Sequence, residues 1–184
     1  QLHCTFQKGM MLKLLLFACA LGASAGSPAV DRHKCITRSG HYGVTVQCPV
    51  DYVATELCTS GKNPDCHHAY TRLRCCAVTE SPNLGAFEAP EATYGVRLAC
   101  SGKKAVTSVC SSGSLANCGG GIYNRIYCFD GYGLNRTHRC RWVSAWKGQW
   151  ARCAADEVIA GVCASGLKAD CEGFHTNINC CKVE

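Results

Sequence analysis

Residues 35–76 read CITRSGHYGVTVQCPVDYVATELCTSGKNPDCHHAYTRLRCC, and this stretch decides the fold. Its six cysteines are separated by 12, 9, 7, 8 and 0 residues. Residues 140–181 repeat the same five gaps, and residues 100–128 repeat the middle part with gaps of 9, 7 and 9. A spacing that recurs with a period of about 50 residues indicates one structural unit used three times. The three predicted modules are residues 26–79, 80–131 and 132–184.

The N-terminal residues are predicted to be a secretion signal. A basic start with Lys13 precedes a short apolar run, and residues 23–25 read Ala-Ser-Ala, which is an A-x-A cleavage pattern. We expect a signal peptide over residues 10–25, preceded by translated upstream sequence in residues 1–9. The apolar run is shorter than the roughly 18 residues that a membrane span needs, so no span is expected.

The cysteine content of the remaining chain is typical of a disulfide scaffold. Of the 18 cysteines, 16 follow residue 25, an even number. This density in a secreted chain favours disulfides over metal or redox chemistry, and no C-x2-C pair of a zinc module occurs. The same part of the chain carries 17 lysines and arginines against 13 acidic residues, a modest balance that does not indicate a nucleic-acid partner. We expect no cofactor.

The local patterns predict an all-β protein. Residues 42–48 and 94–100 alternate apolar and polar side chains, as half-buried strands do, with the second cysteine on the buried face. Turns are predicted to open at the third cysteine of each module, at Cys58, Cys110 and Cys163. Closing strands are predicted at residues 71–75, 124–128 and 176–180. No helical period is sustained, so the predicted fold is three tandem, disulfide-rich, jelly-roll-like β modules.

Comparison of the modules narrows the disulfide connectivity. The middle module lacks the first cysteine and one doublet cysteine together, and a pair lost together is expected to be a bonded pair. Adjacent cysteines in a strand point to opposite faces and take different partners, while the third and fourth cysteines flank a short hairpin. The expected bridges are Cys35–Cys76, Cys48–Cys75, Cys58–Cys66, Cys100–Cys128, Cys110–Cys118, Cys140–Cys181, Cys153–Cys180 and Cys163–Cys171.

The middle module leaves one ambiguity in the alignment. Without a gap, Cys128 would match Cys76; the glycine run 119–121 and the sequence before Cys128 favour one inserted glycine instead. On that alignment Phe87 and Phe129 stand where the other modules have a bridge. We expect these two rings to pack together, because an aromatic pair supplies apolar burial in place of the cross-link.

These features resemble a known family. The order C…C…C…C…CC, the apolar-Cys-x-Ser turn and the strand before the doublet are similar to the Cys/His-rich C-terminal domain of the cholesterol-regulating proprotein convertase of the subtilisin/kexin family, and more distantly to resistin-type β heads. The resemblance covers residues 35–181 and implies three quasi-equivalent β modules with nested first-to-last pairing. The loops here are shorter, and no part of the chain looks like a protease domain. The resemblance therefore implies a fold and no proteolysis.

The chain shows no pattern of catalytic or metal-binding residues. The motifs H-E-x-x-H, G-x-S-x-G, Walker A and GxGxxG are absent, and no spacing pairs Glu56 with Glu157 as acid and base. His67 and His68 could form a metal site with the distant His175, but surface loop histidines are the favoured interpretation. We expect neither catalysis nor a bound metal.

A basic stretch with tryptophans is the candidate binding surface. Residues 131–155 contain no acidic residue, and if they form a strand, their three tryptophans lie on the face opposite the disulfide. Exposed tryptophans beside cations suit sugars or a protein hot spot, whereas docking on neighbouring modules is the alternative, favoured for Trp142. The expected binding residues are Trp146, Trp150, Arg136, Arg139, Arg141, Lys147 and Arg152. A sequon predicts a glycan at Asn135, which would partly shield this stretch.

The sequence predicts a secreted, non-catalytic binding protein of three disulfide-stapled β modules. Its expected partner is an extracellular protein or an acidic polysaccharide, since the basic stretch suits a polyanion. A structural protein of the extracellular matrix or of a mineral layer is one alternative, and a resistin-like soluble ligand is another. The sequence does not predict an oligomeric state.

Overall fold

The computed structural model describes residues 30–41, 43–60, 64–79, 85–93, 95–111, 118–130, 139–164 and 170–183. Within these residues the regular secondary structure is all β, and they contain no helix long and apolar enough to cross a membrane. The predicted all-β, disulfide-rich class is confirmed. The predicted signal peptide and the sequon at Asn135 lie outside the described residues.

Each module supplies longer strands and one short arm. The longer strands of the first module are β1 (Val30–Gly40), β3 (Tyr52–Thr59) and β4 (Thr71–Val78). Those of the third are β10 (Cys140–Ala145), β12 (Glu157–Ala164) and β13 (Thr176–Lys182). The second has β8 (Ala105–Ser111) and β9 (Asn124–Phe129), with the short β5 (Phe87–Glu88) and β6 (Glu91–Ala92) in place of a first strand. The arms are β2 (Val46–Gln47), β7 (Leu98–Ala99) and β11 (Ala151–Arg152).

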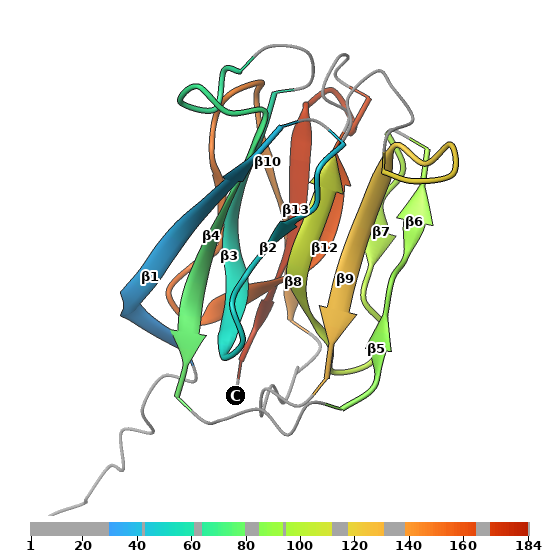
Figure 1. Cartoon of the computed structure of the whole chain (residues 1–184). Helices are drawn as coiled ribbons and strands as arrows, with labels where there is room; N and C mark the ends of the chain where they lie inside the picture. The colour runs from blue at the N-terminus through green and yellow to red at the C-terminus, as the bar shows by residue number, and fades with distance from the viewer. Residues whose placement is uncertain are drawn as a thin grey trace, which may run out of the picture.

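The arms exchange between modules in a ring. The first sheet has the order β1-β4-β3-β11, the second β2-β8-β9-β5 with β6 also on β9, and the third β10-β13-β12-β7. The first module thus lends its arm to the second sheet, the second module to the third, and the third module to the first; in Figure 1, blue β2 lies beside yellow-green β8. The modules are therefore not separate jelly rolls, because each forms one sheet and completes another.

A β-bulge in each central strand holds the incoming arm. The registers of β3, β8 and β12 with their neighbours each skip one residue, at Thr55, Thr107 and Ala160. A bulge leaves its extra residue unpaired in the ladder, so that carbonyl is available to another strand. The second cysteine of another module donates to it in every case: Cys153 to Thr55 at 3.1 Å, Cys48 to Thr107 at 2.8 Å, and Cys100 to Ala160 at 2.8 Å.

The three modules share one hydrophobic core. The central strands β3, β8 and β12 contact one another, and equivalent positions of the modules meet between them. Buried apolar side chains at equivalent positions of this core are Leu57, Val109 and Val162, and Leu73, Ile126 and Ile178. A second cluster at the beginning of the central strands contains Val30, Val53, Ala105 and Val158. A single module of about 50 residues would be a marginal folding unit, and the shared core removes that difficulty.

The described residues contain eight disulfides, and they are the pairs expected from the repeat. They are Cys35–Cys76, Cys48–Cys75, Cys58–Cys66, Cys100–Cys128, Cys110–Cys118, Cys140–Cys181, Cys153–Cys180 and Cys163–Cys171. The bridge of each second cysteine, such as Cys48–Cys75, ties an arm to the closing strand of its own module. Because the arm itself pairs with another module, these bridges interlock the three sheets.

Two expectations about local structure were wrong: the length of two strands and the position of the third cysteine in each module. The expected strands 42–48 and 94–100 shrink to the two-residue arms, although the alternation survives: Val46 and Cys48 are buried while Gln47 is exposed. The third cysteine of each module lies inside a central strand, not at a turn, because the strand continues for one residue beyond it. The three segments that follow these strands lie outside the described residues.

The hairpin turns confirm the inserted glycine. In the first and third modules the turn has two central residues, between Cys66 and Ala69 and between Cys171 and Phe174, with backbone hydrogen bonds in both directions. In the second module three glycines with positive φ, Gly119, Gly120 and Gly121, stand between Cys118 and Ile122. The second module is thus one residue longer at this turn. Cys128 therefore corresponds to Cys75, and each of them pairs with the second cysteine of its module.

Candidate binding groove

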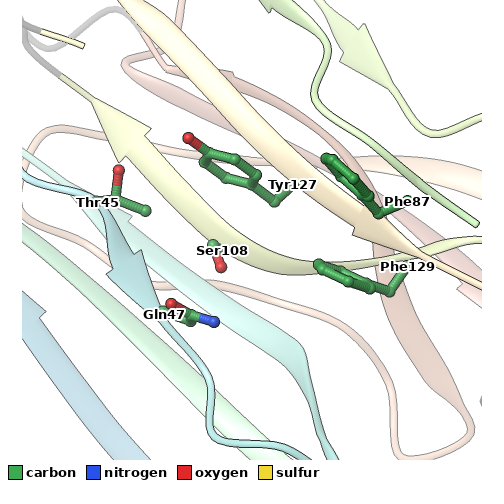
Figure 2. Close-up of a pocket in the computed structure, with 6 residues that line it drawn as sticks. All are labelled: Thr45, Gln47, Phe87, Ser108, Tyr127 and Phe129. Atoms are coloured by element: carbon green, nitrogen blue, oxygen red, sulfur yellow. The ribbon is translucent and has the colours of Figure 1, made fainter. Parts of the chain in front are cut away.

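A groove of about 420 Å³ lies on the solvent-facing side of the second sheet. Its lining residues are Thr45, Gln47, Phe87, Ser108, Tyr127 and Phe129. Figure 2 shows the three aromatic rings along β5 and β9, Ser108 on β8 in the middle, and Thr45 and Gln47 on the far side. The volume falls within the range of roughly 300–1,000 Å³ that is usual for small-molecule sites.

The polar side of the groove belongs to the arm β2, which comes from the first module. Val46 is buried in the shared core, and because neighbouring side chains in a strand point to opposite faces, Thr45 and Gln47 face outward. Gln47 lies directly opposite Ser108 in the register of β2 and β8. Ser108 is only 2% exposed, so it forms the floor. The groove therefore exists only because the arm is exchanged.

The aromatic side of the groove replaces a disulfide. Phe87 pairs with Phe129 across β5 and β9, and their rings stack with centroids 5.7 Å apart and an angle of 24° between the planes. This contact confirms the expected packing of the two rings. Phe87 is 65% exposed and Tyr127 lies two residues before Phe129 on the same face of β9, so the rings form a wall open to solvent.

No charged side chain is among the described residues that line the groove, and the adjacent Glu88 and Arg125 are each paired. Glu88 accepts hydrogen bonds from the Ser101 hydroxyl at 2.6 Å and from Lys104 at 3.2 Å. Partial desolvation would raise the pKa of Glu88, but these hydrogen bonds prevail and lower it. Hydrogen bonds with Tyr127 and with Glu91 raise the pKa of Arg125, which thus remains a cation held at the edge. The groove itself offers uncharged hydrogen-bonding groups.

The expected tryptophan surface is divided by a turn. Strand β10 ends at Ala145 and β11 begins at Ala151, so residues 131–155 do not form one strand and the expected common face of the tryptophans is wrong. The guanidinium of Arg97, from the second module, lies 4.4 Å from the centroid of the Trp142 ring. That of Arg72, from the first module, lies 5.6 Å from the centroid of Trp150. Both rings therefore contact neighbouring modules.

Trp146 is the most exposed of the three tryptophans. It is 53% exposed and follows directly after β10, on the turn that leads to β11. Its ring centroid lies 4.9 Å from that of Phe174 and 6.3 Å from that of His175, both in the same module. Trp146 therefore presents an exposed aromatic surface beside Phe174 and is not among the described residues that line the groove of the second sheet.

Acidic residues from outside the basic stretch neutralise three of its described cations. Arg141 donates to both carboxylate oxygens of Glu157 at 2.9 and 2.8 Å. The other pairs are Lys147 with Asp65 at 3.0 Å and Arg152 with Glu56 at 3.1 Å. Arg139 is exposed, and Arg136 lies outside the described residues. The local absence of acidic residues in the sequence thus does not produce an unpaired cationic surface over these three positions.

The histidines expected to be surface residues occupy a tight turn. His67 and His68 are exposed and are the central residues between Cys66 and Ala69, with φ of 51° and 66°. His175 lies in the third module beside Trp146. Among the described residues, the groups with a metal-ligand arrangement are Glu88 with Cys100 and Cys128, and Glu157 with Cys153 and Cys180. Their cysteines are bridged and offer no thiolate to a metal.

Comparison with known proteins gives the site no further assignment. No protein-family model, no curated protein and no solved structure matches this chain. The resemblance to the convertase domain stays a prediction, and the bridges indicate an oxidising, extracellular environment.

The groove was missed at the sequence level because three distant segments build it: residues 45–47, Phe87 and the hairpin of β8 and β9. The one available signal was the departure of Phe87 and Phe129 from the cysteine pattern, which predicted their contact and not the groove.

Proposed function

We propose that this chain is a secreted, non-catalytic binding protein that holds a neutral carbohydrate in the groove of the second sheet. The observation that carries the proposal is the chemistry of the lining: aromatic rings face uncharged amide and hydroxyl groups across one groove. An uncharged polar ligand with an apolar face fits such a lining better than an ion does. Sugars have both properties, because their C–H faces pack on rings while their hydroxyls form hydrogen bonds.

The lining residues divide these tasks between them. The rings of Phe87, Tyr127 and Phe129 offer the surface on which a sugar ring packs. On the opposite side the Gln47 amide both donates and accepts hydrogen bonds, as a sugar hydroxyl does, and the hydroxyls of Thr45 and Ser108 do the same. Discrimination among sugars would come from these polar groups, since a site that hydrogen-bonds a hydroxyl rejects a ligand without it.

The framework supports a preformed site. Cys48–Cys75 fixes the arm that carries Gln47, and Cys100–Cys128 fixes the strand that carries Tyr127. Holding both sides before the ligand arrives reduces the entropy lost on binding. The paired cations Arg141, Lys147 and Arg152 give less support to the acidic polysaccharide expected from the sequence.

The test is binding of the mature chain to a panel of neutral and acidic oligosaccharides, followed by titration calorimetry with the strongest ligand. We expect a neutral ligand whose affinity changes little with salt. Phe87→Ala and Gln47→Ala should each abolish most of the heat, because each removes one side of the groove. Trp146→Ala is the matched control, since it removes another exposed aromatic ring outside the groove. Binding only to acidic glycans, salt-sensitive and unchanged in Phe87→Ala, would contradict the proposal.

A further inference from the structure

The pseudo-threefold repeat gives every groove position an equivalent on the other two sheets. Each equivalent is found by counting from the same cysteine of the module. On the first sheet, the equivalents of Thr45, Gln47, Ser108 and Tyr127 are Trp150, Arg152, Glu56 and Arg74. On the third sheet, they are Arg97, Ala99, Gly161 and Asn179. Two faces therefore differ from the groove at all of these positions. The contacts of the replacements show what each face can hold.

On the first sheet, an aromatic ring and ion pairs fill the equivalent place. Glu56 stands where the second sheet has Ser108, and it binds Arg152 at 3.1 Å and Arg74 at 3.4 Å. The Trp150 ring, which stands where the second sheet has Thr45, lies under the guanidinium of Arg72. A neutral ligand would have to separate these charges and displace Arg72 from the ring, with no charge of its own to offer in return.

On the third sheet, one arginine covers the aromatic surface. Arg97 stands in the place of Thr45, lies 4.4 Å from the centroid of Trp142, and forms an ion pair with Glu172. Gly161 stands in the place of Ser108 and supplies no hydroxyl. A Cβ atom there would lie 2.6 Å from the carbonyl oxygen of Leu98, so the close approach of β7 excludes a serine at that position. This face lacks both the open ring and the polar floor.

We infer that the chain binds its neutral ligand on one face only, and that Arg72 and Arg97 close the equivalent positions on the other two. The inference rests on the proposed function for the identity of the ligand. It adds the number of ligands that one chain binds, which is one, although the chain contains three repeated modules. A monovalent protein of this kind covers or recognises a glycan and does not cross-link glycan-bearing surfaces, because cross-linking needs more than one site on a particle.

The closure of two faces is tested without any ligand, by acrylamide quenching of tryptophan fluorescence. All three tryptophans of the chain are in the third module. In the Trp146→Phe variant only the two covered rings remain, and we expect their emission to be largely protected from the quencher. Adding Arg97→Thr, which introduces the residue of the open face, should make about half of that emission quenchable, because one of the two rings is uncovered.

Arg139→Thr in the same background is the matched control, since Arg139 is exposed and contacts no ring among the described residues. It should leave quenching unchanged. If the emission of Trp142 and Trp150 is already quenched as readily as that of Trp146, the faces are open and the inference is wrong, whatever the chain binds.

Stoichiometry tests the valency with the neutral oligosaccharide that binds most strongly in the panel. We expect one equivalent per chain, complete loss of binding in Phe87→Ala, and no agglutination of beads that carry the same oligosaccharide. Two or three equivalents, or binding that survives Phe87→Ala, would overturn the inference while leaving carbohydrate binding intact. If no neutral oligosaccharide in the panel binds, the proposed function is wrong. The quenching experiment would still show whether the other two faces are closed.

Discussion

Phe87 and Phe129 occupy the one place where the second module departs most from the others. They face each other in the strand register as Cys35 faces Cys76 and as Cys140 faces Cys181. A disulfide at this place would be compact, whereas the two rings project far enough to line a groove. The two phenylalanines therefore stand in place of one cross-link and, at the same time, form the aromatic side of the groove.

Reintroducing the bridge should close the groove. In the double variant Phe87→Cys with Phe129→Cys we expect a ninth disulfide, and a gain in the free energy of unfolding of about 2–4 kcal/mol, less the lost aromatic packing. Ligand binding should be lost. Intact mass before and after alkylation reports the bridge, and thermal unfolding reports the stability. The double variant Phe87→Ala with Phe129→Ala, which removes the rings without a bridge, should lose binding and stability together.

His175 makes the stability of the third module depend on pH. Burial lowers the pKa of His175, and the charge of Lys147 acts in the same direction while Asp170 opposes it. Its buried Nδ1 atom has no hydrogen-bond partner in the described residues, so protonation there meets no acceptor. The neutral imidazole is thus favoured in the folded state. Its contribution to stability is present above the unfolded pKa of about 6.5 and is lost as the pH falls below that value.

We therefore expect His175→Tyr, which introduces the residue found at the equivalent positions 70 and 123, to flatten the loss of stability between pH 7 and about pH 5. Chemical denaturation at a series of pH values measures the effect. His67→Asn, at an exposed histidine, serves as the control and should leave the wild-type slope in place. An identical slope in wild type and His175→Tyr would show that another group is responsible.

At the scale of elements, the closing strands were predictable, whereas for the arms β2 and β7 only the location was predicted and not the sheet that each joins. Strands β4, β9 and β13 contain the cysteine doublet or its equivalent and alternate in polarity before it, so a local pattern reveals them. The partner of a two-residue arm such as Val46–Gln47 depends on a bulge in another module, and no local pattern encodes that pairing. Strand β1 was missed because it is a largely polar edge strand whose burial does not alternate.

The beginning of β1 is tied to the third module by one side chain. The Arg32 guanidinium donates to the backbone carbonyls of Ala155 at 3.2 Å and Glu157 at 2.7 Å, and also to that of Ala154. These carbonyls belong to the turn that enters β12. Next to this contact, Val30 is buried in the second hydrophobic cluster.

Removing this tie should weaken the whole molecule. We expect Arg32→Met, which keeps the aliphatic length and removes the donors, to lower the free energy of unfolding by about 1–3 kcal/mol, because the partly buried hydrogen bond to the Glu157 carbonyl is lost together with the exposed ones to Ala154 and Ala155. Equilibrium denaturation in guanidinium measures it. Lys34→Met is the matched control, since the Lys34 side chain is 74% exposed and its ion pair among the described residues is with nearby Asp31. A loss of equal size in both variants would show that Arg32 contributes no specific tie.

At the scale of the molecule, the cyclic exchange makes the three modules one folding unit. Every sheet contains a strand from another module, and residues from all three share one core. Unfolding of one module would remove its arm from the next sheet, and would leave the arm that it receives from another module without a partner. The repeat in the sequence therefore does not predict independent domains, although it does predict three similar sheets.

A chain without its third module should consequently fail to fold. Residues 26–131 would lack β11 on the first sheet, would leave β7 without a partner, and would expose core residues such as Leu57 and Val109. We expect this fragment to form non-native disulfides and to be digested rapidly by protease, while the full chain unfolds in a single calorimetric transition. A resistant fragment with native bridges, or two separate transitions in the full chain, would contradict the shared-core description.

The ring of exchanged arms has a consequence for symmetry. Three separate copies of one module could close the same ring, each lending its arm to the next, so the chain has the geometry of a trimer whose subunits have been fused. In a trimer of identical subunits, a lost bridge or a new aromatic residue appears three times. Fusion allows one subunit to change alone. The groove of the second sheet, bordered by two phenylalanines where the other two modules keep a cross-link, is a specialisation that only the fused form permits.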